Sequence, residues 1–163
     1  MLIRDATPAD APAIAAVRER TIRTIVAPLG LYSQAEIDAW AGHFTAGRVA
    51  GLIAMGHYLV AADNERVVGF ARLVMDAPGR ATIRGVFVDA DHVGLGIGTR
   101  LVGELLLRGA RAGVTTFDLV ATLNARSFYE RLGFTLLEQV RHTTVHGAEL
   151  AGLRMRREAA ARP

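Results

Sequence analysis

The hydrophobic pattern changes its period near residue 57, and this change limits the possible folds more than any other feature of the chain. Upstream of it, apolar residues recur at helical spacing. Downstream, three β-rich segments at residues 57–62, 66–75 and 81–89 are separated by short polar turns. This arrangement predicts an antiparallel meander that follows an α-helical N-terminal part.

Polar residues placed just before the apolar stripes predict where the first two helices begin. Thr7 is expected as an N-cap, with Pro8 at the first helical position and Asp10 three residues after the cap. Ser33 and Glu36 have the spacing of a capping box. The next apolar segment, residues 48–55, is ambiguous and is compatible with a third short helix.

In the second half of the chain, segments with helical spacing of apolar residues alternate with β-rich segments. The expected elements are a helix over about residues 97–112, a strand over 115–121, a helix over 124–132 that Gly133 closes, and strands over 134–142 and 148–156. The expected order is therefore β-α-α-β-β-β-α-β-α-β-β. This order predicts the α/β class, with a mixed sheet that carries helices on both faces.

Composition excludes several kinds of chemistry. The chain has 163 residues, 51% of them hydrophobic and 21% charged, which predicts one globular domain over residues 1–163. It has no cysteine, and all 19 basic residues are arginine, so thiolate, Walker A and lysine Schiff-base chemistry are excluded. No signal-peptide pattern and no membrane-length apolar run is visible, so we expect a cytoplasmic protein without a membrane partner. Its arginines are scattered at a net charge of +3, and we expect no nucleic-acid partner.

A glycine-rich stretch, HVGLGIGTRL at residues 92–101, lies between a predicted strand and a predicted helix. Glycines at a helix N-terminus let phosphates approach unpaired backbone N–H groups, and the helix dipole adds attraction. A turn that only packs the helix on the sheet is the alternative. A Rossmann dinucleotide site is rejected, because Leu101 stands where its third glycine belongs and a meander precedes the loop.

Together with a second motif, this stretch resembles the signature of the GNAT superfamily of acyl-CoA-dependent N-acetyltransferases. The family loop is Arg/Gln-x-x-Gly-x-Gly/Ala, and here Gly96 and Gly98 match it whereas Val93 departs from it. The second motif, Asn-Ala-x-x-Phe-Tyr-x-x-x-Gly-Phe, matches without gaps from Asn124 to Phe134. The resemblance covers nearly the whole chain and implies a GNAT fold with a splayed central strand pair.

The resemblance also implies where acetyl-CoA binds. Gly85 would mark a bulge in its strand, and the backbone beyond it would bind the pantetheine amides. The residues expected to bind the cofactor are Val86, Phe87, Val88, Val93, Gly94, Leu95, Gly96, Ile97, Gly98, Thr99, Asn124 and Phe128. Asn124 is also expected to be the N-cap of its helix. We expect no metal, and we interpret His142 and His146 as hairpin residues.

Tyr129 is the predicted catalytic residue. Its phenol, with a pKa of about 10, can protonate a leaving thiolate whose conjugate thiol has a pKa of about 8.5. The base that deprotonates the amine stays open between His57, Asp76, Asp89 and a water chain.

The expected activity is direct transfer of an acetyl group from acetyl-CoA to a primary amine in a ternary complex. The alternatives are a non-catalytic acyl-CoA-binding module and a protein or peptide N-acetyltransferase. By the resemblance, residues 26–57 lie beside the acceptor site, and their few carboxylates indicate a small-molecule amine that is not strongly cationic. A homodimer is left open.

Overall fold

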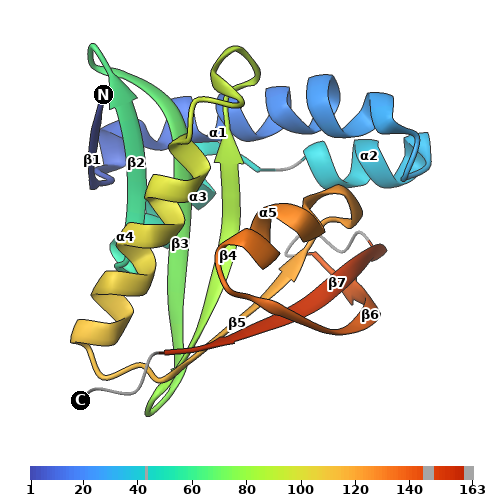
Figure 1. Ribbon diagram of the computed structural model, residues 1–163. Helices are drawn as coiled ribbons and strands as arrows, with labels where there is room; N and C mark the ends of the chain where they lie inside the picture. The colour runs from blue at the N-terminus through green and yellow to red at the C-terminus, as the bar shows by residue number, and fades with distance from the viewer. Residues whose placement is uncertain (43, 145–148, 160–163) are drawn as a thin grey trace.

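Seven strands form one mixed sheet in the order β1-β2-β3-β4-β5-β7-β6 (Figure 1). The computed structural model describes residues 1–42, 44–144 and 149–159. The strands are β1 (Leu2–Asp5), β2 (Tyr58–Asp63), β3 (Arg66–Ala77), β4 (Arg80–Val88), β5 (Thr116–Ala121), β6 (Thr135–Thr143) and β7 (Glu149–Glu158). β4 and β5 run parallel, and the other neighbouring pairs are antiparallel. The mixed sheet and the β2–β4 meander are therefore confirmed.

The helices are α1 (Ala11–Thr21), α2 (Gln34–Ala41), α3 (Ala46–Ala54), α4 (Ile97–Arg111) and α5 (Arg126–Arg131). The ambiguous segment forms α3, so the expected order lacked one helix. The side chain of Thr45 caps α3 by accepting a hydrogen bond from the backbone N–H of Arg48 at 3.3 Å. None of the described helices is long and apolar enough to cross a membrane.

Capping boxes are present at the starts of the first two helices, where the sequence predicted Thr7 as an N-cap and a box of Ser33 and Glu36. Thr7 and Asp10 form the first around a short 3-10 turn, Pro8–Asp10, that leads into α1, and Ser33 and Glu36 form the second at α2. Asp10 also receives two hydrogen bonds from the guanidinium of Arg4, at 2.7 and 2.8 Å. That contact is the main reason why the pKa of Asp10 falls to about 2. Side-chain hydrogen bonds therefore fix the starts of the first two helices, as the sequence predicted.

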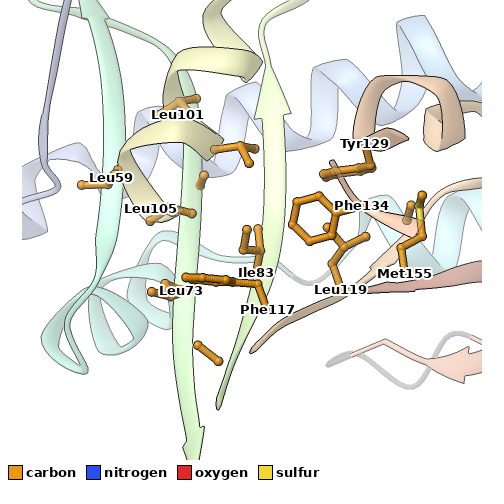
Figure 2. Close-up of a cluster of buried hydrophobic side chains, with 14 of the residues drawn as sticks. Leu59, Leu73, Ile83, Leu101, Leu105, Phe117, Leu119, Tyr129, Phe134 and Met155 are labelled. Carbon is orange, nitrogen blue, oxygen red and sulfur yellow. The ribbon is translucent and has the colours of Figure 1, made fainter. Parts of the chain in front are cut away.

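Strand alternation divides the core between the two faces of the sheet. Leu59 and Ala61 of β2 belong to the cluster under α4, whereas Tyr58 and Val60 belong to the cluster under α1 and α3. Figure 2 shows the first cluster, in which the labelled side chains are Leu59, Leu73, Ile83, Leu101, Leu105, Phe117, Leu119, Tyr129, Phe134 and Met155. A third cluster joins α2 to β7 on the α1 side. Helices therefore cover both faces, as expected.

Gly109 lets α4 lie close to β5. A Cβ atom added there would lie 2.5 Å from Cε1 of Phe117, a core side chain that is 2% exposed. We therefore expect Gly109→Ala to lower the free energy of unfolding by about 1–3 kcal/mol through overpacking. Chemical denaturation measures this change directly.

Gly103 provides the matched control in the same helix. It is exposed, and an added Cβ would meet nothing within 4 Å. Gly103→Ala should raise the free energy of unfolding by about 0.5–1 kcal/mol, because alanine is the better helix former. Equal stability of the two variants would show that Gly109 has no packing role.

The parallel pair at the centre of the sheet separates soon after it begins. β4 and β5 pair only between Arg80–Thr82 and Thr116–Asp118. Beyond these residues the two strands diverge, as Figure 1 shows for β4 and β5. The expected splayed strand pair is therefore present, and its opening leads to the largest cavity that we describe.

Candidate active site

A cavity of about 900 Å³ reaches from the opening between β4 and β5 to the start of α4. Its wall includes Tyr129 and eleven of the twelve residues expected to bind the cofactor: Val86, Phe87, Val88, Val93, Gly94, Gly96, Ile97, Gly98, Thr99, Asn124 and Phe128. Leu95 is the exception, because its side chain is not part of the wall and the residue is 65% exposed. Two motifs about 30 residues apart in sequence therefore line one cavity.

A bulge at Gly85 turns the end of β4 toward this cavity. Arg84 pairs with Arg72, and Phe87 pairs with Phe70, so two residues of β4 face one residue of β3. Gly85 has a φ of +63°, a left-handed conformation that glycine adopts without strain. The bulge that the sequence predicted is therefore present, and the edge of β4 beyond it has no ladder to β5.

One backbone group on this edge already has a partner inside the protein. The hydroxyl of Thr21 donates a hydrogen bond to the carbonyl oxygen of Val88 at 2.8 Å. Thr21 is buried in α1, so this contact ties α1 to the end of β4. Phe87 pairs with Phe70 of β3, so the backbone of Val86 and the N–H group of Val88 are the parts of this edge best placed for a ligand that adds alongside the strand.

The glycine loop and the first turn of α4 form an open anion site. Gly94 and Gly96 have φ values of +85° and +75°, and a Cβ added at either would meet nothing within 4 Å. Gly96 is the N-cap of α4 and offers no side-chain hydrogen bond to the N–H groups of the first turn, which holds no acidic residue. Uncapped N–H groups and the helix dipole attract phosphate oxygens here.

Gly98 has a different role from the other two glycines. A Cβ added there would lie 3.2 Å from Cζ of Phe128 and 3.8 Å from Cγ2 of Val88. Gly98 therefore allows α4 to pack against Phe128. The packing interpretation of the glycine stretch holds for Gly98, whereas nothing in the structure packs against the Cβ positions of Gly94 and Gly96.

None of the three side chains considered as the base lines the cavity. Asp89 is buried, forms ion pairs with Arg20 at 3.0 Å and Arg66 at 2.8 Å, and caps the short 3-10 turn before the glycine loop. Asp76 accepts a hydrogen bond from the hydroxyl of Thr82 at 2.5 Å, and His57 precedes β2 with a left-handed φ of +55°. Asp89 thus positions the loop.

Tyr129 lies on α5 and is 8% exposed. Its ring contacts those of Phe128 and Phe134 edge to face, with centroids 4.8 and 5.8 Å away. Figure 2 shows Tyr129 beside Phe134. Burial raises the pKa of the Tyr129 phenol, so the hydroxyl stays protonated at neutral pH. This hydroxyl has no hydrogen-bond partner among the described residues, and Tyr129 is part of the cavity wall.

The prediction that Asn124 is a helix N-cap is wrong. The chain first forms a 3-10 turn, Leu123–Ala125, whose N-cap is the extended residue Thr122. α5 begins after that turn with Ala125 as its N-cap, so Asn124 lies inside the turn. Its side chain is free for the other expected role, since Asn124 lines the cavity. Gly133 ends α5 with a φ of +82°, as predicted.

Aromatic residues build the wall on the α1 side of the sheet. Trp40 is 7% exposed, and its ring lies near those of Tyr32 and Phe87, with centroids 5.9 and 6.2 Å away. Val26, Tyr32, Trp40, Phe44 and Leu52 of the segment expected beside the acceptor all line the cavity. This segment therefore reaches the same cavity as the glycine loop, from the opposite face of the sheet.

Four polar residues of this wall were missed by the sequence analysis: Arg18, Arg72, Arg84 and His142. They lie on α1, β3, β4 and β6, and no spacing in the sequence links them.

His142 is a half-buried histidine of the cavity wall. It lies in the β6–β7 hairpin, as interpreted from the sequence, whereas His146 lies outside the described residues. The Nδ1 atom of His142 is buried without a hydrogen-bond partner among the described residues. Burial, with a smaller contribution from Arg84, lowers the pKa of His142, so its ring is neutral at neutral pH.

Solved structures share this architecture over almost the whole chain. A GCN5-related N-acetyltransferase from Rhodopseudomonas palustris superposes with a TM-score of 0.84 at 24% identity, over 97% of this chain and 95% of that one. The PaiA N-acetyltransferase from Thermoplasma acidophilum, in complex with coenzyme A, superposes with a TM-score of 0.79 at 19% identity, over 97% of this chain and 98% of that one. At these identities the likeness establishes the fold.

Sequence similarity identifies the family. The uncharacterized N-acetyltransferase ycf52 of Pyropia yezoensis is 38% identical over 71 residues, which are 44% of this chain and 41% of the relative. The match thus spans about two fifths of that curated relative. The family model described as the acetyltransferase (GNAT) domain matches residues 54–136, about half of the chain. The chain therefore belongs to the GNAT family of acetyltransferases.

Proposed function

We propose that residues 1–163 act as one GNAT domain that transfers an acetyl group from acetyl-CoA to a primary amine by direct attack in a ternary complex. One observation carries this proposal: a single cavity is lined by the uncapped start of α4, the free edge of β4 and Tyr129. These three features suit the pyrophosphate, the pantetheine arm and the thioester of acetyl-CoA, in that order. No cysteine is available to carry the acetyl group, which favours direct transfer.

The cofactor binds mainly through backbone groups in this proposal. The N–H groups around Gly96 and in the first turn of α4 hold the pyrophosphate, where Gly94 and Gly96 leave open space. The pantetheine amides pair with the backbone of Val86 and the N–H group of Val88 like an added strand. Val93 supplies no charged or amide group, so the site relies on backbone donors more than the family pattern does.

Tyr129 acts as the proton donor. The amine nitrogen attacks the thioester carbon, the carbon–sulfur bond breaks, and the phenol proton moves to the departing sulfur. Burial raises the pKa of Tyr129, and the same apolar surroundings raise the pKa of a thiol held beside it, so the sulfur stays able to take the proton. The tyrosinate then takes up the proton that the attacking nitrogen still has to lose as it becomes an amide.

His142 accepts the proton that the ammonium group loses before it attacks. A lowered pKa keeps this imidazole neutral, so kcat/KM should fall as the pH drops through a midpoint below about 6.5. We expect His142→Asn to abolish this acid limb and to lower the plateau by roughly 10²-fold. His57→Asn is the control, because His57 lies outside the cavity wall and asparagine tolerates its left-handed backbone. An acid limb that persists unchanged in His142→Asn would remove His142 from the reaction.

Release of free CoA from acetyl-CoA, measured across amino acids, polyamines, aminoglycosides and peptides, tests the proposed function. Saturating acetyl-CoA should also raise the melting temperature, because a ligand at about 100 times its Kd adds roughly 2.7 kcal/mol to the free energy of unfolding. A melting shift without turnover on any acceptor would favour the non-catalytic binding module. Absence of both would contradict the cofactor assignment.

A further inference from the structure

Four arginines line the cavity, and three of them gather on the acceptor side of its wall, whereas the fourth, Arg131, lies on α5. Arg72 of β3 and Arg84 of β4 stand directly opposite each other in the strand register, and Arg18 of α1 lines the same cavity. Like charges placed directly opposite on neighbouring strands destabilise a sheet. No Asp or Glu is among the described residues that line the cavity. The fold thus concentrates positive charge without supplying a counter-ion.

Two of these guanidinium groups keep buried nitrogens without partners. Arg18 is 5% exposed; its Nη2 donates to the carbonyl oxygen of Trp40 at 2.7 Å, whereas its Nη1 has no hydrogen-bond partner among the described residues. The Nε of Arg72 is also buried without a partner, and its Nη2 contacts the sulfur of Met55 at 3.7 Å. Buried polar groups are normally hydrogen-bonded. Because the described residues offer these nitrogens no acceptor, a bound ligand must supply one.

The aromatic neighbours of Arg18 do not fill this need. Its guanidinium lies 4.5 Å from the ring centroid of Phe44 and 5.8 Å from that of Phe87. Such contacts offset part of the cost of burying the charge, yet they satisfy no N–H group in the plane of the guanidinium. Arg4 and Arg156, by contrast, are half-buried arginines that pair with the carboxylates of Asp10 and Asp118. Arg18 and Arg72 differ from these two in having no carboxylate partner among the described residues.

We propose that the acceptor amine carries a carboxylate, and that Arg18, Arg72 and Arg84 bind it. This inference rests on the proposed function and specifies the substrate class of the same site. A carboxylate supplies acceptor oxygens for the guanidinium donors and neutralises the opposed charges of Arg72 and Arg84. A polyamine or an aminoglycoside would instead place positive charge against three arginines. The acceptor is thus an amino acid or a chain that presents an amine close to a carboxylate.

Matched acceptor pairs test the proposal. The probes are the common amino acids, their α-carboxamides, the diamine putrescine, and dipeptides with or without an acidic residue next to the N-terminus, each assayed by release of free CoA. The carboxylate member of the preferred pair should have a kcat/KM about 10- to 100-fold above that of its carboxamide, the range expected for a charge-assisted hydrogen bond. The dipeptides decide whether the carboxylate belongs to a free amino acid or to a peptide.

Variants of Arg72 and Arg84 test whether these residues cause the preference for the carboxylate acceptor. Arg84→Gln and Arg72→Gln should lower kcat/KM for the carboxylate acceptor by about 10-fold or more, and leave kcat/KM for its carboxamide within about twofold. A merely structural role would lower both values equally. Arg111→Gln, an exposed site outside the cavity wall, should keep the full preference.

Two outcomes would overturn the inference, and they differ from failure of the proposed function. Putrescine used as well as the best amino acid, or a carboxylate preference that survives in both Arg72→Gln and Arg84→Gln, would refute the inference while the transferase activity stands. Lack of CoA release with every probe would contradict the proposed function itself, and the inference with it.

Discussion

Tyr129→Phe is expected to lower turnover by about 10²–10⁴-fold, the contribution of a positioned general acid. The ring keeps its contacts with Phe128 and Phe134, and only a hydroxyl without a partner among the described residues is lost. The affinity for acetyl-CoA should therefore change little. The defect lies in the chemical step, so single-turnover rates should fall as steeply as steady-state rates.

The acidity of the leaving thiol provides the internal control for Tyr129. An acetyl donor with a more acidic thiol needs less help to leave, so the loss caused by Tyr129→Phe should shrink with that donor. The melting temperature of the variant should stay close to that of the wild type. Near wild-type turnover of the phenylalanine variant would remove Tyr129 from the mechanism and leave positioning of the two substrates as the source of catalysis.

Gly96→Val should weaken CoA binding by about 10- to 100-fold, the loss expected when one charge-assisted hydrogen bond to the pyrophosphate is blocked. The space in front of Gly96 is open, so a valine side chain would occupy the position proposed for the pyrophosphate. The same substitution also strains the backbone, because the φ of Gly96 is +75°. Titration calorimetry with CoA measures the loss of affinity.

Gly30→Val separates backbone strain from the loss of the phosphate site. Gly30 has a φ of +66°, meets nothing within 4 Å of an added Cβ and lies outside the cavity wall. Both variants should lose a similar free energy of unfolding, about 1–2 kcal/mol, but Gly30→Val should bind CoA normally. Equal CoA affinity of the two variants would mean that the loop around Gly96 is only a turn.

The three glycines of the loop before α4 have different roles that their sequence does not distinguish. The sequence presents Gly94, Gly96 and Gly98 as equivalent members of one motif. In the structure, the first two adopt left-handed conformations over open space, whereas Gly98 accommodates the ring of Phe128. The motif shows which positions are glycine. Only the packing of α4 against α5 shows whether a glycine leaves open space or makes room for a neighbouring side chain.

The features that the sequence determined are those encoded by short stretches of chain. The polar starts of the first two helices, the bulge at Gly85 and the end of α5 at Gly133 follow from residue types at fixed local spacing. Most of the predicted cavity residues followed from the family resemblance that two short motifs carry. The errors were local as well. Helix α3 has a weak signal because glycine and alanine dominate it, and the 3-10 turn before α5 moved the helix start past Asn124.

The tertiary structure decided the acceptor side of the site. Arg18, Arg72, Arg84 and His142 come from four elements that are far apart in sequence, and each is an ordinary polar residue within its own segment. The strand order and register bring them to one cavity, and burial there leaves nitrogens of Arg18, Arg72 and His142 without partners. Local sequence spacing cannot predict such contacts. The burial of these side chains and the repulsion between their charges arise only when the sheet has formed, and these two effects determine their chemistry.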